Sequence, residues 1–197
     1  MIDRKFSRRG VMGMALGGAA SVAVSSPLLA QAVTIDGGAQ GQAPLHMINA
    51  FVSRDWRGHF DNLNNGAILV DIDGTTLHYW SEDESEYLIY PTSVPASEDL
   101  TRRGRTSIIR KVVGPEWRPT PNMLKRNPEW PRYVGPGPEN PLGTHALYLS
   151  WQYYRIHGTN DTRKIGRQSS NGCIGLYNED ILALFERAEI GTQVLII

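Results

Sequence analysis

The distribution of hydrophobic and polar positions predicts a chain built mainly of β-strands. Two runs rich in β-branched and aromatic residues, 66–72 and 75–80, flank Asp73-Gly74, a dipeptide that favours a type I′ hairpin turn. Further strands are expected over residues 87–90, 108–113 and 192–197. The folded domain is therefore expected to begin with a sheet.

The longest alternating run covers residues 146–157 and is expected to be a single strand. Its period of two places one set of side chains on a common face: Leu147, Leu149, Trp151, Tyr153, Arg155 and His157. Trp151 and Tyr153 are expected either to line a substrate groove or to pack in the core. His157 lies at the end of this strand, where the sheet gives way to a loop.

Two segments show the spacing of an α-helix. Apolar residues recur loosely at helical intervals in residues 46–62. A second helix is expected to begin at Asn178, a favoured N-cap residue, with acidic residues in its first turn. Tyr177 is expected to pack onto Leu182 as a hydrophobic staple. The apolar stripe of this helix consists of Ile181, Leu184 and Phe185.

Residues 91–141 contain most of the prolines of the chain, so long regular elements are excluded there. Trp117, Trp130 and Tyr133 lie between these prolines and are expected to hold an extended loop together. A loop of this kind either forms one wall of a site or is a structural loop without substrate contact.

The N-terminus has the organisation of an export signal. Four basic residues precede an apolar run at 11–24, and Ala30-Gln31-Ala32 has the small-x-small form of a cleavage site. Ser7-Arg8-Arg9 resembles a twin-arginine signal, and the general secretion pathway is the alternative. We therefore expect a signal peptide at 1–32, a flexible linker at 33–45 and one folded domain at 46–197, located in the periplasm and without a stable membrane span after cleavage.

Charge and composition exclude several classes of function. The 20 basic and 20 acidic residues of the whole chain become 16 and 19 once the signal is removed, so the remaining chain is slightly acidic. Such a balance argues against nucleic-acid binding. The five histidines lack ligand spacing, and we therefore expect no metal. A single cysteine cannot form an internal disulfide, and an exported free thiol is a liability unless it is buried or used.

That cysteine, Cys173, lies among small residues sixteen positions after His157. A lone cysteine is often a buried small hydrophobe, but an imidazole beside it would lower its pKa and later protonate a leaving amine. The two residues meet if the intervening loop folds back. The carbonyl of Gly158 could then fix the tautomer of the histidine, and the amides of Gly172 and Cys173 could stabilise an oxyanion.

His157-Gly158-Thr159-Asn160, followed after a loop by Ser169-Ser170-Asn171-Gly172-Cys173-Ile174, resembles the signature of the L,D-transpeptidases of bacterial cell-wall assembly, the YkuD family. The segment 140–149 is similar to the lead into the catalytic strand of the periplasmic members. The resemblance covers roughly residues 66–197.

The resemblance implies a mainly β, β-sandwich-type catalytic domain with short helices and no cofactor. It implies Cys173 as nucleophile, His157 as base and acid, and the Gly158 carbonyl as the group that orients His157. Family members cleave a peptidoglycan stem peptide through a cysteine thioester, pass the acyl group to an amine of another stem, and react with carbapenems. Ser170, Asn171, Tyr153 and Arg155 are the residues expected to contact substrate.

The chain departs from the family pattern at two positions. Asn171 stands where histidine is most frequent, and Gly175 stands where the periplasmic branch typically has arginine. An arginine provides a rigid fork for carboxylates or carbonyls, which glycine lacks. Either substrate recognition or the cross-link type differs, or another cation substitutes: Arg155, Arg163 or Arg167.

Three further functions stay open at this stage. Water could replace the acceptor amine, which gives an L,D-carboxypeptidase. A protein amine could be the acceptor, although the sequence carries no sign of one. The domain could also bind the wall without turnover, given the lost arginine.

Overall fold

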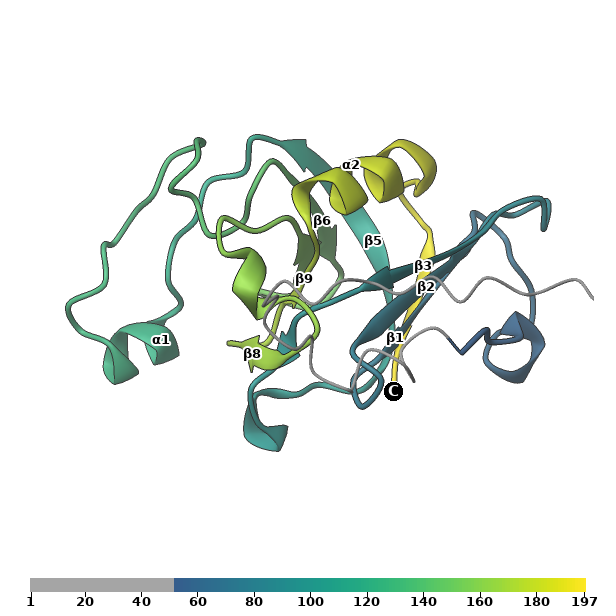
Figure 1. Cartoon of the computed structure of the whole chain (residues 1–197), viewed down its shortest axis with the longest axis horizontal. Coiled ribbons are helices and arrows are strands. Elements are labelled where there is room, and N and C mark those ends of the chain that lie inside the picture. The colour runs from purple at the N-terminus through teal and green to yellow at the C-terminus, as the bar shows by residue number, and fades with distance from the viewer. Residues whose placement is uncertain (1–51) are drawn as a thin grey trace, which may run out of the picture. The chain divides into compact units, whose positions relative to one another are not determined.

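The structure is a computed structural model that describes residues 52–197 (Figure 1). The expected signal at 1–32 and linker at 33–45 lie outside the described residues, as does the start of the helix expected at 46–62. None of the helices in residues 52–197 combines the length and the apolar character that crossing a membrane requires.

The described chain is mainly β, as predicted. Its strands are β1 (Ala67–Asp71), β2 (Thr76–Trp80), β3 (Tyr87–Pro91), β4 (Val94–Pro95), β5 (Gly104–Val113), β6 (His145–Leu149), β7 (Arg155–His157), β8 (Gln168–Ser170), β9 (Ile174–Gly175) and β10 (Gln193–Ile196). The α-helices are α1 (Pro121–Arg126) and α2 (Asn178–Arg187), and single 3-10 turns are η2 (Trp56–Gly58), η3 (Glu98–Leu100) and η4 (Thr162–Lys164).

Eight of these strands form one sheet in the order β3-β2-β1-β10-β5-β6-β7-β9. The last strand, β10, lies in its middle, parallel to β1 and antiparallel to β5. β5 is ten residues long, so the expectation that prolines exclude long elements from residues 91–141 is wrong here, because residues 96–114 contain no proline. β5 pairs with β10 through its first half and with β6 through its second, with a register shift between Ile108 and Arg110. A bulge bends a strand and increases its twist, so the sheet curls at β5. β4 and β8 form a separate parallel pair.

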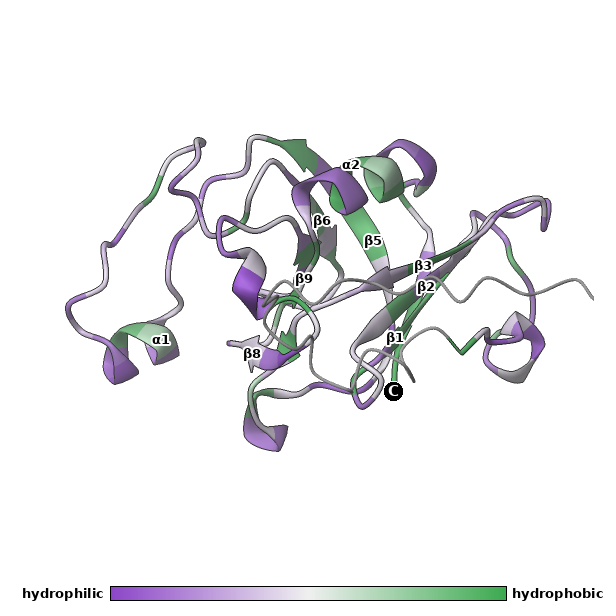
Figure 2. Cartoon of the chain, viewed as in Figure 1, coloured by the Kyte–Doolittle hydropathy of each residue, from purple (hydrophilic) through white to green (hydrophobic). Residues whose placement is uncertain are grey.

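Helix α2 packs against β6 and β7 (Figure 1). Ile181 and Leu184 are fully buried, as the predicted stripe requires, and Figure 2 shows both hydrophobic and polar stretches along this helix. Hydrophobic residues otherwise concentrate in the strands of the sheet (Figure 2). The main core includes Ile68, Val70, Ile108, Leu147, Ile156, Ile174, Leu176 and Val194.

The strand expected at 146–157 is wrong in one respect, because the structure divides it into β6 and β7. These strands are antiparallel neighbours, and Ala146 pairs with His157. The turn between them has Tyr153 in the left-handed region, at φ 70°. Nothing in Ser150-Trp151-Gln152-Tyr153 marks this reversal, since the turn contains neither glycine nor proline.

The first hairpin is confirmed, but its predicted type I′ turn is wrong. Such a turn needs positive φ at both Asp73 and Gly74. The structure instead joins β1 and β2 through four residues, with only Thr75 at positive φ (51°). The Asp71 carboxylate accepts a 2.8 Å hydrogen bond from the Gly74 amide and so stabilises this wider loop.

Two helix predictions also need correction. Within the described part of residues 46–62 only the 3-10 turn η2 forms, because Asp55 caps one short turn that ends at Gly58 and His59. At α2 the N-cap position belongs to Tyr177 instead of Asn178, and Leu182 is 41% exposed, which does not fit the predicted staple. The Asn178 side chain bonds instead to the backbone of Thr144 and Thr159.

Candidate active site

The sheet brings Cys173 and His157 to one place. His157 is the last residue of β7, and Cys173 immediately precedes β9. These two strands are parallel neighbours in which Ile156 pairs with Ile174 and His157 with Gly175. The loop between them therefore folds back as expected, and Cys173 and His157 line the same cavity, of about 120 Å³.

The Cys173 thiol is protonated at rest. Burial raises its pKa, and the charge and backbone amide of Arg155 only partly oppose that shift. The thiol donates a hydrogen bond of 3.3 Å to the backbone carbonyl of Tyr153. A base must therefore remove the proton before the sulfur can attack.

His157 is held as a neutral base. Its Nδ1 lies 2.5 Å from the carbonyl oxygen of Gly158, and a carbonyl can only accept, so Nδ1 carries the proton. Burial lowers the pKa of His157 to about 4, with help from the charges of Arg155 and Lys164 and against the Gly158 hydrogen bond. Nε2 is thus left with a free lone pair at neutral pH.

Gly158 is glycine for a packing reason. Its φ is not in the left-handed region, yet a Cβ there would overlap Oδ1 of Asn178, as would a Cβ at Gly143. That amide accepts from Thr144 N at 3.1 Å and donates to Thr159 O at 3.0 Å. Asn178 therefore ties the β6 entry to the loop that carries the Gly158 carbonyl.

The turn before Cys173 is stabilised by Ser170. Its hydroxyl donates to the Cys173 carbonyl at 2.6 Å and accepts from the Gly172 amide at 3.2 Å. Gly172 has a φ of 122°, which other residues rarely adopt. The Gly172 amide is thus already bonded to Ser170, and of the two expected oxyanion donors the Cys173 amide is the more available. Asn171 is exposed and lines the cavity.

Of the three arginines considered as replacements for the missing cation, only Arg155 lines the Cys173 cavity. Its Nε is buried and has no hydrogen-bond partner within residues 52–197, and its guanidinium lies 5.0 Å from the Tyr148 ring centroid. Arg163 forms a two-bond fork with Asp161 and is largely exposed. Arg167 is exposed and does not line this cavity.

The glycine at 175 makes room for Ser93. The two residues exchange backbone hydrogen bonds of 2.8 and 3.0 Å, and a Cβ at Gly175 would overlap the Ser93 hydroxyl. Ser93 is nearly buried and lines the cavity with Cys173. Restoring an arginine at 175 would therefore require the Ser93 side chain to move.

Sequence reasoning placed some cavity residues and missed others. Tyr153 lines the cavity, as does the proline-rich loop through Trp117 and Trp130, so that loop is a wall of the site. Trp151 packs against the core and the edge of Tyr154, so its core interpretation is the right one. Residues without a local signal include Ser93, Arg118, Met123 and Lys164, which reach the site only through tertiary contacts.

The site shows no arrangement for a metal. Within residues 52–197 no three side chains of His, Cys, Asp or Glu come together in a geometry that could hold an ion.

Comparison with known proteins points to one family. The model of the L,D-transpeptidase catalytic domain (YkuD) matches residues 65–196. The chain is 48% identical over 191 residues, and 97% of each chain, to the "Putative L,D-transpeptidase in ATP synthase subunits region ORF 5" of Fuscovulum blasticum. It is 37% identical over 142 residues to the "Probable L,D-transpeptidase ErfK/SrfK" of Escherichia coli strain K12, which covers 70% of this chain and 45% of that protein.

A solved structure agrees on the fold. The L,D-transpeptidase from Mycobacterium smegmatis superimposes with a TM-score of 0.53 at 21% identity, over 68% of this chain and 58% of that one. The chain thus spans nearly the full length of one relative and about half of the Escherichia coli protein.

Proposed function

Because the chain belongs to the L,D-transpeptidase family, whose members are transferases, we propose that it is an exported cysteine transpeptidase acting on peptidoglycan stem peptides. One observation carries the proposal: parallel pairing of β7 and β9 places a thiol and an imidazole with a free Nε2 on one cavity. Export rests on the signal pattern of residues 1–32, by either secretion route, and places the enzyme in the periplasm.

The resting groups define the first half-reaction. Nε2 of His157 takes the thiol proton as the Cys173 sulfur bonds to the carbonyl carbon of the stem. The Cys173 amide is the donor best placed for the developing oxyanion, with Gly172 joining if Ser170 releases it. The C–N bond then breaks, and the proton on Nε2 passes to the leaving amine, so a D-amino acid departs and a thioester remains.

The second half-reaction reverses the proton path. An amine of another stem attacks the thioester, Nε2 accepts its proton, and the Cys173 sulfur leaves and is reprotonated by the imidazolium. The Gly158 carbonyl stabilises the imidazolium in both steps because it accepts from Nδ1–H. If water attacks in place of the amine, the product is that of an L,D-carboxypeptidase.

Arg155 provides the cation that an arginine at position 175 would otherwise supply. Its Nε has no hydrogen-bond partner within residues 52–197, and its place in the Cys173 cavity suits its guanidinium to a stem carboxylate. Tyr153 and Asn171 complete this substrate wall.

The test uses the purified protein and tetrapeptide stems, with mass spectrometry of the products. We expect release of D-alanine, stem dimers, and a covalent carbapenem adduct, all abolished in Cys173→Ala. Product that stays monomeric when an amine acceptor is added in excess would make the enzyme a carboxypeptidase. A protein that forms no adduct and releases no D-alanine would be a wall-binding module without turnover.

A paired substitution tests Arg155. Arg155→Met should raise KM for the tetrapeptide about tenfold or more, whereas Arg155→Lys should recover part of that loss, since it keeps the charge without the fork. Arg167→Met is the control, because Arg167 is exposed and does not line the Cys173 cavity. Equal KM values for Arg155→Met and Arg167→Met would remove the role assigned to Arg155.

A further inference from the structure

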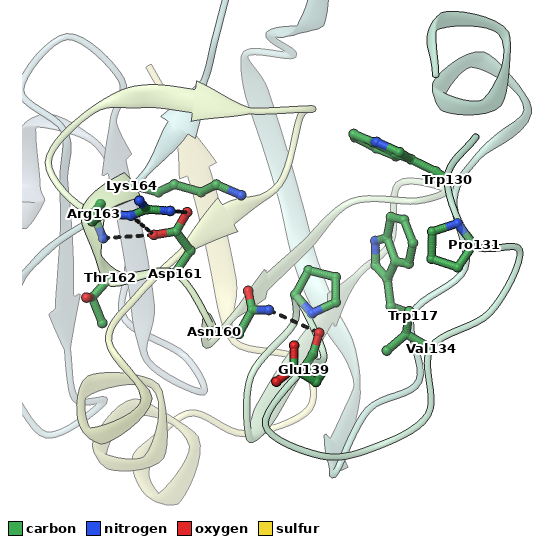
Figure 3. A pocket seen from close by; sticks show the side chains of 11 residues that line it. Trp117, Trp130, Pro131, Val134, Glu139, Asn160, Asp161, Thr162, Arg163 and Lys164 are labelled. Carbon is green, nitrogen blue, oxygen red and sulfur yellow. Dashed lines mark hydrogen bonds and ion pairs between the residues drawn. The ribbon is translucent and has the colours of Figure 1, made fainter. Parts of the chain in front are cut away.

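A larger cavity, of about 690 Å³, adjoins the Cys173 cavity and shares four lining residues with it: Trp117, Trp130, Pro141 and Lys164. Its volume lies within the range of small-molecule sites. Figure 3 shows its two sides: the proline-rich loop provides Trp117, Trp130 and Pro131, and the segment after Thr159 provides the side chains of residues 160–164 across from them. Nothing in the proposed chemistry at Cys173 uses this space.

The aromatic side of the cavity is a pair of tilted indoles. Trp117 and Trp130 have ring centroids 5.8 Å apart and an interplanar angle of 55°, and both are only partly buried. Backbone hydrogen bonds anchor both residues: Trp117 and Val134 exchange two of 2.9 Å, and the Trp130 amide donates to the Asn127 carbonyl at 3.2 Å. Exposed indole faces in a fixed position carry negative charge density that attracts polarised C–H groups.

The facing side is polar but close to neutral. The Asp161 carboxylate and Arg163 guanidinium satisfy one another through bonds of 2.7 and 3.0 Å, and the Lys164 ammonium is balanced in sign by Glu139. The Asn160 amide donates to the Glu139 carbonyl at 3.0 Å, which leaves its oxygen and one N–H available (Figure 3). This side thus offers both donors and acceptors, without the excess positive charge that a carboxylate-rich stem peptide would favour.

A ligand with one apolar C–H face and a rim of neutral hydroxyl and amide groups fits both sides of this cavity. A pyranose ring with an N-acetyl group has that character: its axial C–H bonds stack on an aromatic face, and its equatorial groups bond to planar amides, carboxylates and guanidinium groups. We propose that this cavity binds an N-acetylated sugar of the glycan chain, so that the enzyme takes stem peptides still attached to glycan. The proposal rests on the proposed function, because that function gives the substrate a glycan chain.

Two measurements test it. The first follows the indole N–H signals of Trp117 and Trp130 by NMR in Cys173→Ala during titration with tetra-N-acetylchitotetraose, a neutral N-acetylated glycan without peptide. We expect those two signals to shift. The side-chain amide signal of Asn160, which lines this cavity and not the Cys173 cavity, should shift with chitotetraose and not with free tetrapeptide. The second compares kcat/KM for a disaccharide-linked tetrapeptide with that for the free tetrapeptide, using D-alanine release.

Trp130→Ala should lower the ratio of these two kcat/KM values about tenfold, since it removes a stacking face. Asn160→Ala should lower the ratio by a smaller factor. It provides a second test of the cavity in case Trp130→Ala does not fold. Tyr133→Ala is the matched control: Tyr133 is an exposed aromatic of the same loop that does not line the cavity. An unchanged ratio in both Trp130→Ala and Asn160→Ala would overturn the sugar site, as would an Asn160 amide signal that shifts with free tetrapeptide and not with chitotetraose.

The outcomes separate this inference from the proposed function. D-alanine release without indole shifts in chitotetraose rejects the sugar site and keeps the transpeptidase. Indole shifts in a protein that releases no D-alanine keep the sugar site and reject the transpeptidase.

Discussion

Burial moves the pKa values of Cys173 and His157 in opposite directions: it raises that of the thiol and lowers that of the imidazole to about 4. Both shifts favour the neutral forms, so the resting pair is a thiol beside a neutral base and not a thiolate–imidazolium ion pair. Attack by the sulfur and transfer of its proton to Nε2 must then be closely coupled, and the rate depends on a neutral His157.

The decrease in the acylation rate at acidic pH should follow the protonation of His157. Since protonated His157 cannot accept the thiol proton, carbapenem acylation should be half lost near pH 4 instead of near the ordinary histidine value of about 6.5. The measurement is the rate of adduct formation by intact mass between pH 4 and 8, with circular dichroism at each pH to confirm folded protein. A midpoint near 6.5 in folded protein would show that His157 is not desolvated as the structure places it.

Gly158 is the residue where a single methyl group should matter most. In Gly158→Ala the new Cβ overlaps the Asn178 amide, so the loop must shift and the carbonyl that orients His157 moves with it. Displacement of about 1 Å in a catalytic group can cost about 100-fold, and we expect kcat to fall by that order. Gly58→Ala, where a Cβ meets no atom within 4 Å, is the control for D-alanine release. Full activity in Gly158→Ala would mean that Asn178 yields without moving the carbonyl.

At the scale of elements, the conformation of the proline-rich loop between β5 and β6 depends on one buried side chain near its end. Asn140 is fully buried; its Nδ2 donates to the carbonyls of Pro115 at 2.7 Å and Gly135 at 2.9 Å, and its Oδ1 accepts from Leu142 N at 2.8 Å. Together with the Trp117–Val134 bridge, these bonds join the two ends of an irregular loop and hold the two indoles at the Cys173 cavity.

Replacing Asn140 should make the whole proline-rich loop more mobile. Asn140→Ala leaves buried carbonyls and an amide without partners, which costs about 1–3 kcal/mol for such a group. We expect faster limited proteolysis within residues 115–139 and weaker binding of chitotetraose, while Asn122→Ala, an exposed residue on α1 of the same loop, behaves as the unaltered protein. If Asn140→Ala resisted proteolysis as well as Asn122→Ala does, the loop would be held mainly by its aromatic contacts.

Elements with a strong local signal were predictable, and those defined by distant contacts were not. The hairpin of β1 and β2 was marked by two β-rich runs around a turn dipeptide, and Cys173 with His157 by a compact local pattern. The division of β6 from β7 was not, because Tyr153 adopts a positive φ in a turn whose residues resemble a strand. Ser93 and Lys164 reach the site through tertiary pairing, as at the Ser93–Gly175 bridge, which no single stretch of sequence encodes.

At the scale of the whole molecule, two histidines of the curled sheet share one electrostatic constraint: His78 lies in the core, and the partly buried His157 lies at the active-site cavity. His78 on β2 is 1% exposed, with Nε2 3.0 Å from the Thr76 hydroxyl and Nδ1 2.8 Å from the Tyr87 hydroxyl. Burial lowers the pKa of His78 to about 4, assisted by the charges of Arg54 and His59 and opposed by that of Asp71. Folding therefore requires both His78 and His157 to stay neutral.

The free energy of unfolding should consequently decrease as the pH falls from about 6.5 to about 4. In this interval the unfolded chain binds protons at these histidines and the folded chain does not, so acid favours unfolding; below about 4 this contribution levels off. For His78 a displacement of the pKa from 6.5 to about 4 amounts to about 3 kcal/mol at most.

Urea unfolding at pH 7 and pH 4.5 measures this difference in the free energy of unfolding. His78→Gln should reduce the difference by most of that amount, even though the substitution lowers stability at pH 7. In the double variant His78→Gln/His157→Gln, the free energy of unfolding should change even less between the two pH values. The two imidazoles share no hydrogen-bond partner, so their effects add. A difference between the two pH values that is the same with and without His78 would assign the acid sensitivity to the carboxylates instead.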